Sequence, residues 1–176
     1  SSLPPIPGRA PSSSDQSVLA QLARERIDEH FPVLVYGEEL FDDFILQTDV
    51  KMVGGIDEQM AGIAFRFQDE KNYCYIRASA LGDSFSFFRV AQGQLVTPVS
   101  SKYSFETNVW YHLTIEAKGN QIRASVDGKE LLLVVLRDAP MAAGKIGFWT
   151  KSDSISFFGT TRLTYRPKQI LAQQLI

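Results

Sequence analysis

Apolar and polar residues alternate over short stretches from Phe31 onward, and Val, Ile, Thr and aromatic residues recur in these stretches. This two-residue period is typical of β-strands that bury one face. We expect about a dozen strands, located in 31–36, 44–52, 61–68, 72–80, 84–91, 94–100, 109–118, 121–128, 129–136, 145–150 and 154–165. Turn signals such as Gly54-Gly55, Gly119-Asn120 and Asp127-Gly128 separate them. The pattern predicts an all-β fold, an antiparallel β-sandwich or jelly roll.

The two ends of the chain lack this alternation. Residues 1–16 are rich in Pro, Ser and Gly and are expected to be a flexible linker or a mature N-terminus. Residues 17–167 are expected to form the sandwich domain, and 168–176 a short helical tail or the start of a further element. The stretch Ser17–Ala23 has two interpretations, because its apolar residues fit a helical stripe as well as an extended segment.

Side-chain alternation divides each strand into two faces. The apolar faces, expected to pack between the sheets, hold Ile63, Phe65 and Phe67, then Cys74, Ile76 and Ala78, then Ile146, Phe148 and Thr150. The opposite faces hold Ala64, Arg66 and Gln68, then Tyr73, Tyr75 and Arg77, then Gly147, Trp149 and Lys151. Such an aromatic and cationic face suits a carbohydrate surface. The pattern alone favours the competing interpretation, a solvated sheet face whose side chains pair across strands.

Composition narrows the function classes. The net charge of −2 and the pI near 5.7 give no electrostatic reason to bind nucleic acid. No apolar run approaches the roughly 20 residues that span a bilayer, so we expect no membrane insertion. A single cysteine, Cys74, excludes an internal disulfide and is expected to be a small core residue, and two histidines leave little for a metal centre.

Longer motifs resemble one known superfamily. The segments "GIDEQMAGIAFRFQDEKNYCYIRASAL", "FFRVAQGQ", "WYHLTIEAKGNQI", "VDGKEL" and "GKIGFWTKSDSISFF" are similar to the concanavalin A-like lectin/glucanase superfamily. Within it they resemble the bacterial 3-keto-disaccharide hydrolase domain family, over residues 17–166. The resemblance implies a jelly roll, favours extended structure for Ser17–Ala23, and implies an exported bacterial protein, secreted or periplasmic.

The same resemblance implies a binding face. The matched motif positions are Arg66, Arg77 and Lys151, which would line a concave sheet together with Tyr75 and Trp149, and Arg89 would extend that surface. This chain departs from the family pattern in two places. It has Gly159-Thr160 where many relatives carry an acidic pair, and Cys74 where they carry Tyr. A function that needs carboxylates near Phe158 is therefore in doubt.

Candidate catalytic acids are few. No Glu-x-Asp-x-x-Glu run supplies the carboxylate pair of a retaining glycosidase. Asp57 and Glu58 are the best isolated acids, and local turn hydrogen bonding is the competing role for Asp57. Lys151 and Asp153 are expected to pair and to order the turn after Trp149.

Metal and histidine chemistry have little support. The resemblance implies that a calcium site is possible, but no EF-hand-like ligand spacing appears, and we expect no cofactor. Trp110 and His112 share one face of their strand, and the pattern leaves open whether that face is the core.

These observations lead to a main hypothesis and two alternatives. The main hypothesis is a lectin-like, non-catalytic domain that binds an oligosaccharide or polysaccharide, with other domains of the same chain as further partners. The first alternative is a hydrolase or lyase acting on glycosides or 3-keto-disaccharides, with Asp57 or Glu58 as base. The second is a protein-interaction or sensory module.

Overall fold

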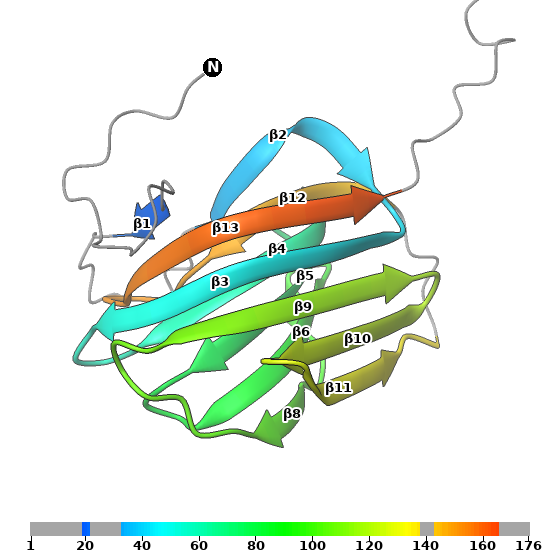
Figure 1. Cartoon of the computed structure of the whole chain (residues 1–176). Helices are drawn as coiled ribbons and strands as arrows, with labels where there is room; N and C mark the ends of the chain where they lie inside the picture. The colour runs from blue at the N-terminus through cyan, green and yellow to red at the C-terminus, as the bar shows by residue number, and fades with distance from the viewer. Residues whose placement is uncertain (1–18, 22–32, 138–142, 166–176) are drawn as a thin grey trace, which may run out of the picture.

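The computed structural model describes residues 19–21, 33–137 and 143–165. These residues form two antiparallel sheets packed face to face, as Figure 1 shows, which confirms the all-β jelly-roll prediction. The expected linker (1–16) and helical tail (168–176) lie outside the described residues. Within the described ranges no helix is long and apolar enough to cross a membrane.

One sheet has six strands. Its order is β1 (Leu19–Gln21), β13 (Ile155–Tyr165), β3 (Phe44–Gly54), β9 (Trp110–Lys118), β10 (Gln121–Val126) and β11 (Lys129–Val135). β1 pairs antiparallel with β13, so the extended interpretation is correct for residues 19–21. The other residues of Ser17–Ala23 lie outside the described part of the chain.

The second sheet has seven strands. Its order is β2 (Val33–Phe41), β12 (Gly144–Trp149), β4 (Met60–Asp69), β5 (Asn72–Ser79), β6 (Ser84–Ala91) and β7 (Gln94–Leu95), with β8 (Val99–Lys102) paired to β6 beside β7. Because β12 lies between β2 and β4, and β13 between β1 and β3, late strands complete both sheets.

The core lies between the two sheets and contains the apolar faces predicted by alternation. From the seven-stranded sheet come buried Ile63, Phe65, Cys74, Ile76, Phe85 and Ile146, and from the six-stranded sheet Leu46, Val50, Leu113, Ile115 and Ile122. The hairpin at Asp127-Gly128 is also confirmed, with both residues at positive φ between β10 and β11.

The alternation fails at one point on β4. Arg66 has φ of 49°, and the register of β4 shifts against both β5 and β12 around it. This bulge moves Phe67 to the outer face, where its ring lies 5.3 Å from that of Tyr73. The prediction that Phe67 points inward and Arg66 outward is therefore wrong.

Candidate functional site

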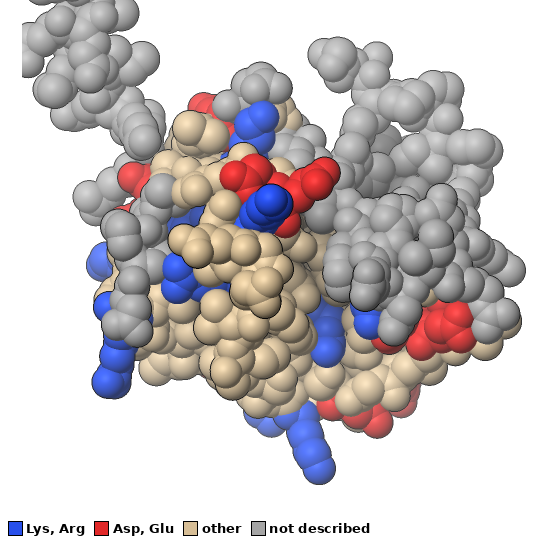
Figure 2. Space-filling view, turned by 180° about the vertical axis from the view of Figure 1, so that it is seen from behind, with Lys and Arg blue, Asp and Glu red and all other residues tan. Residues whose placement is uncertain are grey.

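Four predicted site residues lie on or beside the outer face of the seven-stranded sheet. Tyr75 and Arg77 come from β5, on the side opposite the buried Cys74 and Ile76, and Trp149 ends β12. Lys151 follows in the turn after Trp149. Figure 2 shows this side of the molecule, with a broad area of uncharged residues and basic and acidic groups side by side above it.

A row of stacked rings runs across this face. The ring centroids of Tyr75 and Trp149 are 4.5 Å apart at 17°, and those of Tyr75 and Phe88 are 4.7 Å apart at 6°. Because β5 lies between β12 and β6, Tyr75 is the middle ring. Tyr73 adds a fourth ring, 5.7 Å from Tyr75. We call these four residues the aromatic row.

The aromatic row is more buried than the sequence suggested. Trp149 was expected to project onto an open sheet, but it is only 1% exposed and Tyr75 only 5%. Residue 62, opposite Trp149 on β4, is a glycine, so no side chain there separates Trp149 from β5. The ring faces therefore contact one another. Burial raises the pKa of Tyr75 above its ordinary value, which keeps its hydroxyl protonated.

Charged side chains border the aromatic row. Lys151 Nζ lies 3.0 Å from Glu58 Oε1, and these side chains are 21% and 18% exposed. The Arg77 guanidinium lies 5.0 Å from the ring centre of Phe88. Burial lowers the pKa of Arg77, and the negative charge of Glu58 acts against that change. The face thus holds a partly buried ion pair and a second cation beside aromatic rings.

A carboxylate far along the chain orders the loop that carries Glu58. The buried Asp153 carboxylate accepts hydrogen bonds from the backbone N–H groups of Ile56 at 2.6 Å and Glu58 at 3.0 Å. It also accepts one from Asp57 at 3.2 Å. Lys151 forms an ion pair with Glu58, and the expected Lys151–Asp153 pair stays a prediction. Of the two candidate acids, Asp57 is exposed, and Glu58 joins the cluster through its ion pair with Lys151.

Arg66 and Arg89 are not on this face. Arg66 is 4% exposed and donates to the backbone oxygens of Asp42 at 3.1 Å and Gly119 at 2.7 Å. Burial lowers its pKa. Arg89 pairs in register with Cys74, whose side chain points inward, so Arg89 shares that side of the sheet. The expectation that these two arginines line the face with Tyr75 is wrong. The bulge turns Arg66 inward, and the alternation of β6 places the Arg89 side chain on the inner side of the sheet.

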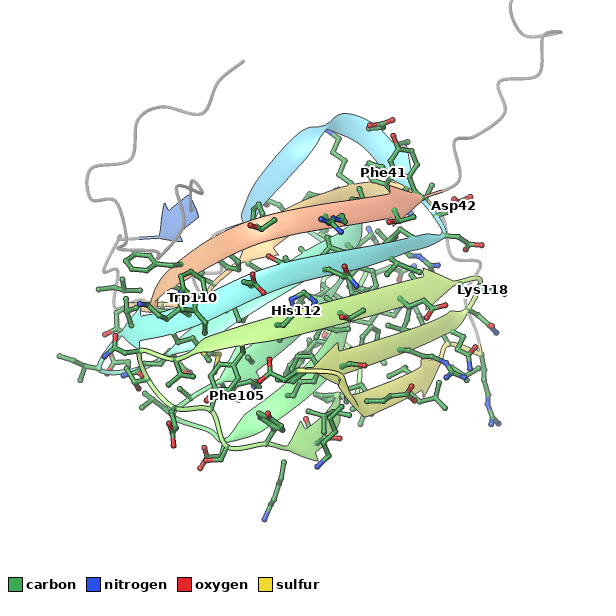
Figure 3. The ribbon with its side chains drawn as sticks, viewed as in Figure 1. Phe41, Asp42, Phe105, Trp110, His112 and Lys118 are labelled. Atoms are coloured by element: carbon green, nitrogen blue, oxygen red, sulfur yellow. The ribbon has the colours of Figure 1, made fainter. Side chains whose placement is uncertain are left out.

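The opposite surface of the molecule carries Trp110 and His112. Tyr111, Leu113 and Ile115 face the core, so Trp110 and His112 lie on the outer face of the six-stranded sheet, as Figure 3 shows. His112 Nδ1 is 2.7 Å from Asp49 Oδ1. No group of three or more His, Cys, Asp or Glu in the described ranges is arranged to hold a metal ion.

Sequence reasoning missed two contributors to the site, Ser84 and Phe88. Ser84 Oγ accepts a hydrogen bond from Arg77 Nη1 at 2.9 Å, and Phe88 stacks on Tyr75. The signal that could have found them is the alternation of "SFSFFRVA", because Phe85 and Phe87 take the core face and leave Ser84, Ser86 and Phe88 outside.

Comparisons with known proteins agree with this architecture. The model of the 3-keto-alpha-glucoside-1,2-lyase-like domain family matches residues 19–158. No curated protein matches the chain. Among solved structures, the chain is similar to the carbohydrate-binding module CBM66 from Bacillus subtilis at 19% identity and a TM-score of 0.68, covering 81% of this chain and 85% of the module.

Two further solved structures share the fold. One is a native glycosidic hydrolase at 16% identity and a TM-score of 0.60, covering 91% of this chain and 81% of that one. The other is sheep galectin-11 in complex with glycerol, at 7% identity and a TM-score of 0.56, covering 82% of this chain and 100% of the galectin. At these identities the likeness shows a common fold.

Proposed function

The chain belongs to the 3-keto-alpha-glucoside-1,2-lyase-like domain family, and on that premise we propose that it is a non-catalytic carbohydrate-binding domain. The saccharide would bind on the outer face of the seven-stranded sheet. The observation that carries the proposal is the Glu58–Lys151 ion pair, with Arg77 nearby, at the border of the aromatic row. The carbohydrate-binding module with the same fold supports the choice of ligand class.

The arrangement suits sugar hydroxyls. Hydrogen bonds that involve a charged partner are roughly twice as strong as neutral ones. Glu58 offers acceptors, and Lys151 and Arg77 offer donors, so a hydroxyl can both donate and accept in this cluster. The ring faces are occupied by one another, so the aromatic row would act as a rigid apolar wall rather than as a stacking platform.

The state of the acids supports binding without turnover. A retaining glycosidase needs two carboxylates about 5–5.5 Å apart, one of them protonated as an acid. Here Asp153 accepts three backbone N–H groups, and Glu58 faces the Lys151 ammonium. Both carboxylates therefore already have partners within the protein.

The proposal is tested with the full chain and a panel of neutral and acidic oligosaccharides, with and without calcium. A ligand that binds the folded state raises the melting temperature, and calorimetry then gives its affinity. Glu58→Gln keeps the size and an acceptor for Lys151 but removes the carboxylate, so we expect affinity to fall at least about tenfold. The matched control is Glu130→Gln, which alters an exposed ion pair with Arg123 on the other sheet and should leave affinity unchanged.

Binding by no saccharide in the panel would refute the proposal, and so would equal affinities for Glu58→Gln and the unaltered chain. Trp149→Ala is not used, because the ring is buried and its loss would open a cavity that costs about 3–5 kcal/mol of folding stability.

Membership of this family favours a second function, the lyase activity that the family name describes. A 3-keto sugar has an acidic α-proton, and the Glu58 carboxylate next to two cations could remove that proton while the cations stabilise the resulting negative charge. Incubation with a 3-keto glucoside distinguishes the two functions. Turnover that is lost in Glu58→Gln would establish the enzyme, and binding without turnover would leave the carbohydrate-binding domain.

A further inference from the structure

A second group of polar residues lies on the same outer face, beyond Phe88. Lys102 on β8 lies opposite Ser84 on β6, and Ser100 lies opposite Ser86. Residues directly opposite on antiparallel strands point to the same side of the sheet. Ser84, Ser86, Ser100 and Lys102 therefore share the face of Arg77, and we call these five residues the hydroxyl strip.

Hydrogen bonds hold the hydroxyl strip in place. Arg77 Nη1 donates to Ser84 Oγ at 2.9 Å, and Ser100 Oγ donates to Ser86 Oγ at 2.8 Å. Ser84 accepts from Arg77, so its own hydroxyl hydrogen can be donated to a ligand. Ser84 is thus linked to one cation by a hydrogen bond and to the other, Lys102, by strand pairing.

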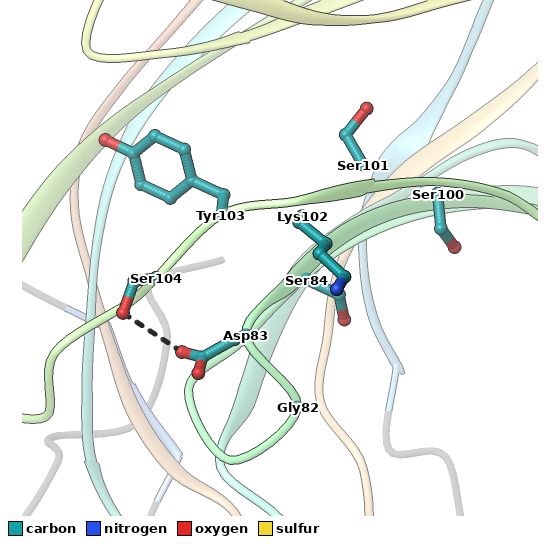
Figure 4. Close-up of a pocket in the computed structure, with 8 residues that line it drawn as sticks. All are labelled: Gly82, Asp83, Ser84, Ser100, Ser101, Lys102, Tyr103 and Ser104. Atoms are coloured by element: carbon teal, nitrogen blue, oxygen red, sulfur yellow. Dashed lines mark hydrogen bonds between the residues drawn. The ribbon is translucent and has the colours of Figure 1, made fainter.

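An open hollow adjoins the hydroxyl strip, as Figure 4 shows. Its volume is about 710 Å³, and it is lined by Gly82, Asp83, Ser84 and residues 100–104. Asp83 is the acid among these residues, and its carboxylate accepts a hydrogen bond from Ser104 Oγ at 3.2 Å. Lys102 is exposed, so its ammonium group can reach a ligand in the hollow.

The two cations of the hydroxyl strip have no carboxylate partner within the part of the chain that the structure describes. Among the described residues neither Arg77 nor Lys102 forms an ion pair, and the nearby Glu58 is paired with Lys151. Arg77 is half-buried, where its charge is screened less than at the surface. An anionic group that contacts both cations and the Ser84 hydroxyl would receive charge-assisted hydrogen bonds.

We infer that the hydroxyl strip and its hollow bind the acidic group, a carboxylate or a sulfate ester, of an anionic saccharide. This inference rests on the proposed carbohydrate-binding function and names its ligand class. Arg77 connects the aromatic row with the hydroxyl strip, because its guanidinium lies over the Phe88 ring and donates a hydrogen bond to Ser84. The sugar ring would extend from the hollow toward the aromatic row, and the acidic group would lie between Arg77 and Lys102.

The test compares a charged ligand, a galacturonic acid tetrasaccharide, with its uncharged methyl ester. We expect calorimetry to show at least about tenfold tighter binding of the acid. That preference should shrink as the sodium chloride concentration rises. A sulfated galactan tetrasaccharide and its desulfated form, measured in parallel, show whether carboxylate or sulfate is preferred.

Lys102→Glu reverses one charge of the hydroxyl strip at an exposed position and should abolish the preference for the acid. The control is Lys118→Glu, the same charge reversal at an exposed position on β9, in the other sheet. It should keep the preference. If neutral and acidic forms bind equally, or if Lys102→Glu has no effect, the inference is wrong while the proposed function stands. If no saccharide of either kind binds, both are wrong.

Discussion

The Asp153 carboxylate determines where Glu58 lies. It accepts backbone hydrogen bonds from Ile56, Asp57 and Glu58, which lie 95 to 97 residues earlier in the chain. The next residue repeats this pattern, since Ser154 Oγ accepts the N–H of Met60 at 3.0 Å. These side chains therefore provide acceptors that the loop before β4 cannot obtain from a neighbouring strand.

Replacing this carboxylate should destabilise the protein and displace Glu58 as well. Asp153→Asn leaves one carbonyl acceptor and turns an amide donor toward N–H groups, so we expect a loss of about 1–3 kcal/mol of unfolding free energy in urea titration. Asp43→Asn is the control, because Asp43 accepts a single exposed bond from the Gly119 N–H. Equal losses for the two variants would contradict this account of the loop.

At the scale of the strand, the sequence predicted most of the β-strands and the residues that β5 and β12 contribute to the site. Alternation placed Tyr75, Arg77 and Trp149 on the outer face correctly, because β5 and β12 keep a regular two-residue period there. The bulge at Arg66 could not be predicted, since a non-glycine residue at positive φ carries no signal in the local pattern. The error at Arg89 arose from the resemblance, whereas alternation along β6 would have placed it inward.

The degree of burial could not be predicted either. Whether an outward Trp149 is open or covered depends on residues that pack across strands, such as Tyr75, and not on its own strand. The ion pair joins Glu58 and Lys151 across 93 residues, and the order of the strands that brings them together is not written in either segment.

A strand-scale prediction concerns Gly62, near the start of β4. A Cβ atom at this position would overlap the backbone oxygen of Ile76 and lie 3.0 Å from the Cα of Arg77. We expect Gly62→Ala to separate β4 from β5 and to cost more than about 2 kcal/mol of unfolding free energy. In Gly119→Ala, where no atom lies within 4 Å of the added Cβ, only the positive φ opposes the change, at about 1 kcal/mol. Urea unfolding of both variants would contradict the prediction if Gly62→Ala were the milder.

At the scale of the whole molecule, the buried thiol of Cys74 makes the folding stability depend on pH in the alkaline range. Burial raises the pKa of its thiol to about 11 from an ordinary 9.0, with Arg66 and Arg89 opposing the shift. Between these pH values the unfolded chain releases the proton and the folded chain keeps it. The contribution of this thiol to the free energy of unfolding is therefore fully present below pH 9 and is lost as the pH rises toward 11.

This titration predicts that the unaltered chain and Cys74→Ala differ in how their free energies of unfolding change with pH. The unaltered chain should lose on the order of 2–3 kcal/mol of unfolding free energy through Cys74 as the pH rises from 9 to 11. Cys74→Ala starts less stable but should lose less over this range, and the tyrosines account for the remaining loss. Parallel slopes of unfolding free energy against pH would show that the Cys74 thiol does not contribute.

The interleaved strand order has a consequence for how the protein is made. Until β12 and β13 leave the ribosome, β2 lacks its neighbour between itself and β4, and β1 lacks the strand that joins it to β3. Pairing between such distant segments is slow, because long loops must close before contacts form. The nascent chain must therefore remain soluble with both sheets divided until residues 144–165 have been synthesised.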